Sequence, residues 1–84
     1  MKNMKKLNIK HTIMINLINI YEGITDKINI KRVKIDMNNK YVEENIEIKI
    51  NMNPGFNPRE TIIMKNHGNF INNNKGNLII DFKL

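Results

Sequence analysis

The segment from Tyr41 to Met52, YVEENIEIKINM, indicates most clearly which fold this chain adopts. In its second half, apolar and polar residues alternate strictly: Ile46, Ile48, Ile50 and Met52 are separated by Glu47, Lys49 and Asn51. Successive side chains of a β-strand point to opposite faces of the sheet. This period of two therefore predicts a strand over residues 41–52, with one face buried and the other in solvent.

Other parts of the chain repeat this alternation. It predicts further strands over residues 7–15, 26–36, 61–64 and 77–84. In the second of these, Val33 and Ile35 fall on the face opposite to Ile30. Such a change of phase predicts a bulge or a change of partner strand near residues 31–32.

One short helix interrupts the strands. Leu17, Ile18, Ile20 and Tyr21 break the alternation and fit one or two helical turns near residues 17–22. Asn16 suits the N-cap, and Gly23 suits the position that ends the helix. Segments rich in Asn, Gly and Pro predict turns or loops at residues 37–40, 53–58, 66–69 and 72–76.

The composition supports a mainly β protein. Ile supplies 17 of the 84 residues, and its β-branched side chain suits a pleated, half-buried surface. Ala, the best helix former, is absent, while Asn (17) and Lys (12) are in an excess typical of an AT-rich genome. A chain of this length has room for one domain. We predict a small two-sheet β-sandwich or open barrel, largely antiparallel, over residues 7–84, preceded by a flexible basic N-terminus at residues 1–6.

No set of residues predicts catalysis or metal binding. The chain has neither Ser nor Cys, which removes two common nucleophiles, disulfides and thiolate metal sites. The carboxylates form no pair with catalytic spacing, and Glu43-Glu44 suits a solvated surface. His11 suits a partly buried strand position and His67 a solvated turn, without the acidic ligand cluster that zinc would need. The four Gly residues are isolated, so no phosphate-binding loop is present. We expect a protein that is not an enzyme and has no cofactor and no metal.

The N-terminal segment has the outline of a signal peptide but not its details. Asn16 and Asn19 interrupt the apolar stretch, and no small-residue cleavage site follows it. No stretch approaches the about 20 apolar residues needed to cross a bilayer. We therefore expect a soluble protein of a reducing compartment, the cytoplasm, with no membrane partner.

The net charge of +6 leaves nucleic acid open as a partner, because Lys and Arg neutralise phosphates. The lysines are dispersed, however, and the strands carry Ile where an RNA-binding sheet would carry aromatic rings. A solvated basic surface is the simpler interpretation. The aliphatic strands instead suit an extended peptide bound by strand addition, through backbone hydrogen bonds and shallow side-chain pockets.

Five segments, in order, are similar to those of one known family. They are NLINIYEG (16–23), TDKINIKR (25–32), EIKINMNPGF (47–56), ETIIMKNHGN (60–69) and KGNLIIDF (75–82). Together they make residues 7–84 resemble the C-terminal substrate-binding β-domain of DnaJ-type J-domain co-chaperones. The first of that family's two such domains, in the form without a zinc-binding insertion, fits best.

The resemblance implies chaperone-type binding of unfolded polypeptides in an aliphatic groove between the first two strands. The matching positions are Ile13, Ile28, Ile30 and Ile80, with His11 and Ile15 nearby. The alternative, that these residues simply form the core, explains Ile15 and Ile30 equally well.

The same groove holds the acidic tail of an Hsp70-class chaperone in some family members, which grip it with lysines. Here those positions are Asp26, Asn29 and Asn45. This leaves Lys27 and Arg32 as candidate cations and predicts weakened tail binding, because charge-assisted contacts are lost.

From the resemblance we also expect a chain without the J-domain and its His-Pro-Asp motif, without the second β-domain and without the dimerisation segment. We therefore expect a separate J-domain protein as a partner. Our leading hypothesis is a co-chaperone domain that binds unfolded client polypeptides and assists protein folding. A degenerate co-chaperone remnant without client function and a basic nucleic-acid-binding β-domain are the alternatives.

Overall fold

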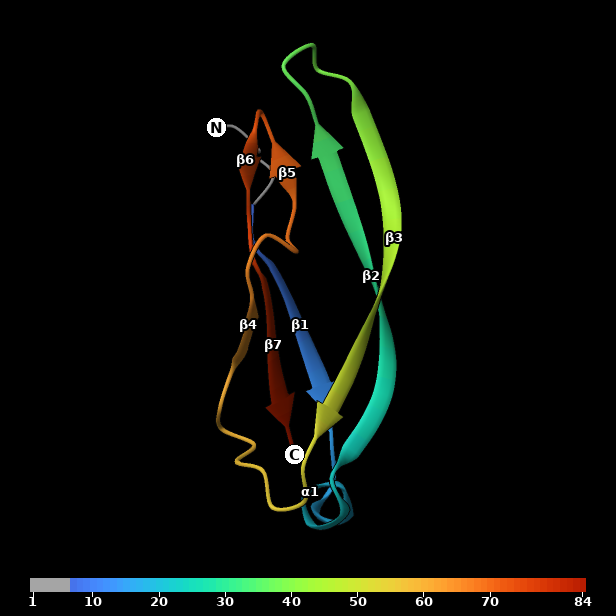
Figure 1. Ribbon diagram of the computed structural model, residues 1–84, viewed down its shortest axis with the longest axis vertical. Coiled ribbons are helices and arrows are strands. Elements are labelled where there is room, and N and C mark those ends of the chain that lie inside the picture. Colours follow the sequence, from blue (N-terminus) through green and yellow to red (C-terminus); the bar gives the residue numbers. More distant parts are fainter. Residues whose placement is uncertain (1–6) are drawn as a thin grey trace.

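A long hairpin of β2 (Ile24–Ile35) and β3 (Tyr41–Met52) runs along one side of the computed structural model, which describes residues 7–84 (Figure 1). The basic N-terminus predicted at residues 1–6 lies outside these described residues. The two strands pair antiparallel and without interruption, from Ile24 opposite Met52 to Ile35 opposite Tyr41. The strand predicted over residues 41–52 is confirmed. Of the two alternatives for residues 31–32, the bulge was wrong, and β2 keeps β3 as its partner throughout but gains β5 (Phe70–Ile71) on its other edge at Lys34 and Ile35.

The change of phase in β2 has a different cause. Ile30 and Val33 are both buried, with 3% and 8% of their surface exposed, but on opposite faces of the strand. Figure 1 shows that the hairpin extends beyond the ends of the neighbouring strands. Past Ile30, the inner face carries Arg32, whose guanidinium lies 4.5 Å from the centre of the Phe70 ring instead of in the aliphatic core. On the inner face, the apolar pattern therefore ends where the second sheet no longer covers β2.

The strands form two mixed sheets, and neither closes into a barrel. The four-stranded sheet has the order β3-β2-β5-β6, where β5 is Phe70–Ile71 and β6 is Asn74–Lys75. The three-stranded sheet has the order β1-β7-β4, where β1 is Ile9–Met14, β4 is Ile62–Met64 and β7 is Leu78–Lys83. The predicted mainly β, two-sheet sandwich is confirmed. Two pairings, β1 with β7 and β2 with β5, are parallel, which the alternation did not predict.

The short helix α1 (Leu17–Glu22) joins β1 to β2, as predicted. Asn16 and Asn19 form a reciprocal capping box, in which each side chain accepts a hydrogen bond from the other's backbone N–H. Gly23 ends the helix with a φ of 85°, a conformation that favours glycine. No helix in the described part of the chain is long and apolar enough to cross a membrane.

The predicted loop over residues 72–76 is shorter than expected. Asn74 and Lys75 are strand residues, because they pair with Ile71 and Phe70. Only Asn72 and Asn73 form the turn, with φ values of 49° and 69°. Two consecutive positive φ angles define the two-residue type I′ turn of β-hairpins, and Asn tolerates this conformation well.

One aliphatic cluster fills the space between the sheets. The hairpin contributes Ile30, Ile48 and Ile50, and β7 contributes Leu78 and Ile80, which have no exposed surface. Seven partly buried side chains surround this core cluster: Ile9, Ile13, Ile28, Ile46, Met52, Ile62 and Met64. The β1–β7 pair is thereby held against one face of the hairpin.

Replacing Ile50 with Ala is expected to lower the free energy of unfolding by about 2–5 kcal/mol, because it leaves a cavity in this cluster. Ile63 on β4 is 58% exposed, so Ile63→Ala is the matched control, with an expected change of about 0.5 kcal/mol or less. Urea denaturation followed by circular dichroism measures both values. If Ile50→Ala does not fold, Ile50→Val provides a milder test, with an expected loss of about 0.5–1.5 kcal/mol. Equal losses at Ile50 and Ile63 would contradict the packing described above.

Candidate functional site

Within residues 7–84, the strands β1 and β2 each have one backbone edge without a strand partner. β1 is the last strand of its sheet and pairs only with β7. β2 pairs with β3 along one edge, but along its other edge it meets β5 only at Lys34 and Ile35. Among residues 7–84, the edge of β2 from Ile24 to Arg32 is therefore open to an additional strand.

The backbone groups on this open edge follow from the hydrogen bonds at its far end. The Val33 N–H donates to Asn69 Oδ1 at 2.9 Å, and the Ile35 carbonyl accepts from the Asn72 N–H at 2.9 Å, so both residues point away from β3. Backbone groups alternate in direction along a strand of an antiparallel pair. Four residues therefore direct their N–H and C=O groups to the open edge: Thr25, Lys27, Asn29 and Lys31.

The same reasoning applies to β1. The Ile9 N–H donates to the carbonyl of Asn77, directly before β7, at 2.9 Å, and the Ile15 N–H donates to that of Lys83, at the end of β7, at 2.8 Å. The odd-numbered residues of β1 therefore point toward β7. Lys10, Thr12 and Met14 direct their backbone groups away from it. Side chains of both strands, including Ile13 from β1 and Ile28 from β2, pack against the one core cluster. The two open edges thus border a common aliphatic interior.

Some of the predicted groove residues are buried in the interior of the protein, and others lie half-buried at its edge. Ile30 and Ile80 lie within the core cluster, and Ile80 has no exposed surface. Ile15 is also buried, with 9% of its surface exposed, but it is not part of that cluster. Ile13 and Ile28 are half-buried and pack against the cluster from β1 and β2, and half-buried His11 sits opposite Ile80 in the β1–β7 register. Residues with accessible surface next to the open edges are therefore His11, Ile13 and Ile28.

The two predicted tail-binding cations are not brought together. Arg32 donates through Nε to Glu44 Oε1 at 2.6 Å and also contacts it through Nη2, and only 14% of its side chain is exposed. Lys27 lies on the outer face of β2, where its Nζ is 3.8 Å from Glu47 Oε2. The two cations thus lie on opposite faces of one strand, each near a carboxylate of β3.

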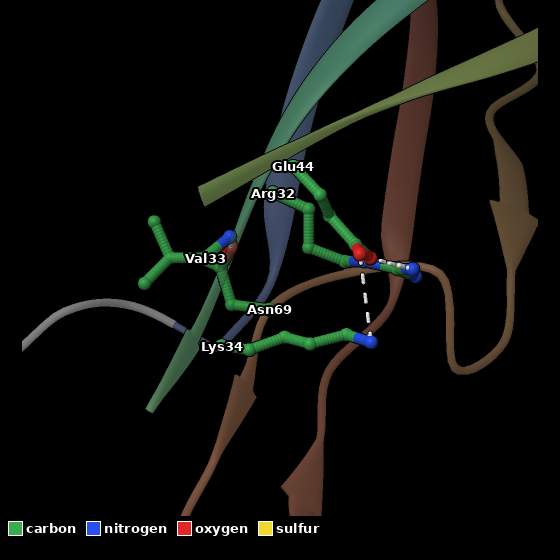
Figure 2. A network of polar contacts seen from close by, with 5 residues as sticks. All are labelled: Arg32, Val33, Lys34, Glu44 and Asn69. Carbon is green, nitrogen blue, oxygen red and sulfur yellow. Dashed lines mark hydrogen bonds and ion pairs between the residues drawn. The ribbon is translucent and has the colours of Figure 1, made fainter. Parts of the chain in front are cut away.

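Arg32 belongs to a polar cluster at the far end of the hairpin. Figure 2 shows Arg32 and Lys34 of β2 converging on Glu44 of β3, with Asn69 beside Val33. The Lys34 Nζ is 3.5 Å from Glu44 Oε2 and 5.3 Å from the centre of the Phe70 ring. An open pocket of about 220 Å³ lies next to this cluster; its lining residues are Lys34, Ile35, Asp36, Phe70, Asn73 and Lys75. Arg32 and Lys34 thus have partners within the fold. The Phe70 ring of β5 contacts both of them and also the Lys75 Nζ of β6, 5.4 Å from its centre, so the cluster joins β5 and β6 to the hairpin.

Sequence reasoning missed Asn69 and Phe70, and it was wrong to place Glu44 on a solvated surface, because Glu44 is half-buried and pairs with Arg32. The position of Glu44 opposite Arg32 follows from the hairpin register, so it was predictable once the turn at residues 37–40 was placed. No sequence signal shows that the Asn69 side chain takes the place of a backbone acceptor for β2. Phe70 belongs to a strand of two residues, which is too short for periodicity to reveal.

Hydrogen bonding from Arg32 is the main cause that lowers the pKa of the Glu44 carboxyl. Desolvation opposes it, and the positive charges of Arg32 and Lys34 lower the pKa further. On the β1–β7 pair, the Thr12 hydroxyl donates to Asp81 at 2.7 Å and lowers the pKa of that carboxyl, with help from Lys10. Both carboxylates therefore act as ion-pair and hydrogen-bond partners in the fold. Among residues 7–84, no three His, Asp or Glu side chains lie close enough together to hold a metal ion.

Comparison with protein families gives a match to the DnaJ C terminal domain over residues 9–84. No curated protein matches the chain significantly. The family match covers both sheets, α1 and both open strand edges.

The substitution Glu44→Gln tests the polar cluster through the dependence of stability on pH. A carboxyl whose pKa is lowered by folding stabilises the protein above its unfolded pKa and loses this effect as the pH falls through the folded pKa. The variant should therefore be less stable than the wild-type protein at pH 7, and the difference should disappear as the pH falls below about 4. Denaturation curves between pH 7 and pH 3 measure this.

Glu60→Gln is the control, because Glu60 is exposed and outside the cluster. It is expected to change stability little at any pH. A deficit of Glu44→Gln that stays constant down to pH 3 would contradict the ion pairs described above.

Proposed function

This chain belongs to the DnaJ C-terminal domain family, a family of chaperone substrate-binding domains, and from this premise we propose that it binds extended, aliphatic segments of unfolded polypeptides. It does so without catalysis. The bound segment adds as a strand to the open edge of β2.

The observation that carries the proposal is the uncovered backbone of that edge. Thr25, Asn29 and Lys31 direct N–H and C=O groups to a side of β2 where residues 7–84 provide no partner strand. An extended peptide satisfies such groups through main-chain hydrogen bonds, which depend little on the sequence of the peptide. This suits a protein that must accept many different unfolded chains.

The side chains beside the edge give the binding its preference. An added strand directs every second side chain to the inner face of the sheet. On that face these side chains contact the half-buried Ile13 and Ile28, which pack against the core cluster. Burying aliphatic side chains contributes about 25 cal/mol per Å² of apolar surface, so segments rich in Ile, Leu and Val are preferred. Ile30 and Ile80 are buried in the core cluster against which these two side chains pack.

The acidic tail of an Hsp70-class chaperone is a weaker candidate ligand for the same edge. Arg32 would have to exchange Glu44 for the tail, and Lys27 points to the outer face. Exchanging one ion pair for another yields little net free energy. We therefore propose unfolded clients as the main partners, with a separate J-domain protein as the link to an Hsp70-class chaperone.

Asn29→Pro tests strand addition directly. Proline removes the N–H at the centre of the open edge, and its ring occupies the path of an added strand. Binding of a labelled peptide of alternating Ile and Thr should weaken at least about tenfold, because a main-chain hydrogen bond and close approach are both lost. Fluorescence anisotropy measures the affinity.

Glu47→Pro is the matched control. Glu47 lies directly opposite Asn29 in the hairpin register, so its N–H points away from β2 on the outer edge of β3. It is expected to bind the peptide like the wild-type protein, and similar thermal unfolding of both variants shows that neither has lost the fold. Equal binding by Asn29→Pro and Glu47→Pro would refute addition at β2. Binding of this uncharged peptide is expected to change little with salt, whereas the binding of a nucleic acid would fall steeply as salt rises.

A further inference from the structure

The end of the β2 edge nearest α1 carries a carboxylate where an added strand would lie. Asp26 Oδ1 accepts a hydrogen bond from the Lys27 N–H at 2.8 Å. That N–H is one of the groups that point to the open edge, as the direction of the Val33 N–H shows. The Asp26 carboxylate is therefore held at the edge itself and not over the sheet.

This carboxylate is not neutralised within the fold. Asp26 is exposed, and among residues 7–84 no cation lies within ion-pair distance of it. The neighbouring Lys27 is turned to the outer face, where it approaches Glu47. Glu22, the last residue of α1, adds a second negative charge four positions earlier, and the last turn of α1 carries no basic residue. This end of the edge is thus negative in a chain whose net charge is +6.

The position has two consequences for an incoming segment. Its backbone cannot use the Lys27 N–H while Asp26 holds it, so main-chain bonding is weakest at this end. A Lys or Arg side chain of the segment gains a charge-assisted contact with Asp26, whereas Asp or Glu is repelled. The farther end of the edge differs, because Arg32 and Lys34 there share the carboxylate of Glu44.

We propose that Asp26 forms a cation subsite at the α1 end of the β2 edge, which selects aliphatic client segments that carry Lys or Arg beside the aliphatic residues. This inference rests on the proposed function and names the class of client. It also predicts a direction: the cation of the client lies toward α1, so the groove distinguishes the two orientations of a bound strand.

The test uses three peptides with the same alternating Ile and Thr centre. One carries two Lys residues before the centre, one carries them after it, and the third carries Gln at both ends. One Lys peptide is expected to bind the wild-type protein about three- to fivefold more tightly than the Gln peptide, the size typical of an exposed ion pair. The advantage should shrink as salt rises, because the contact is exposed.

Asp26→Asn removes the charge but keeps an oxygen that can accept from the Lys27 N–H. It should abolish the advantage of the favoured Lys peptide and leave the affinity for the Gln peptide unchanged. Glu60→Gln, which removes an exposed carboxylate in the loop before β4, is the control and should keep the advantage.

Equal binding of all three peptides, or an advantage that persists in Asp26→Asn, overturns the cation subsite and leaves the proposed function standing. Absence of binding by all three peptides to the wild-type protein overturns the proposed function and the subsite together.

Discussion

The uninterrupted register between β2 and β3 is the constraint on which the rest of the structure depends. It places Ile30, Ile48 and Ile50 on one face, where they meet Leu78 and Ile80 of β7. A slip of one strand by one residue would turn its core-facing aliphatic side chains to the opposite face, because side chains alternate with a period of two. The burial of this cluster therefore selects one register. That register in turn decides which backbone groups of β2 face β3 and which face the open edge.

Polar residues, above all Asn, form the turns and the helix cap around the aliphatic cluster. The excess of Asn, which composition alone relates to codon usage, has a structural role at several positions. Asn39, Asn66, Asn72 and Asn73 have positive φ values, Asn16 and Asn19 cap α1, and Asn69 continues the edge of β2 through its side chain. Asn suits these places because its short amide bonds nearby backbone groups and tolerates the left-handed conformation. Turns that usually need Gly are thus formed in a chain with only four Gly residues.

The candidate site shows which of its features a pattern of residues can predict and which it cannot. The pattern correctly identified the strands that carry the site, and the family resemblance named Ile13, Ile28, Ile30 and Ile80 together. Three-dimensional packing separates them, because Ile80 lies between β1 and β4 at the centre of its sheet, whereas Ile13 and Ile28 keep accessible surface beside open edges. Periodicity identifies the buried face of a strand, but not which members of that face lie at its rim. The partners of Arg32 and Lys27 likewise depend on the register and the face, which the spacing of charges does not give.

The sequence by itself determined the elements with local causes: the period of two in residues 41–52, the capping box at Asn16, and the end of α1 at Gly23. It also determined the mainly β class and the family, because the ordered motifs extend along the whole described chain. Only the tertiary structure decided the parallel pairing of β1 with β7, the first and last strands of the described residues. The pairing of distant strands depends on how much aliphatic surface the whole chain buries, and no short window of sequence contains that sum. The open edge of β2, which carries the proposed function, and the Asp26 carboxylate held at it, which carries the proposed cation subsite, are results of that packing.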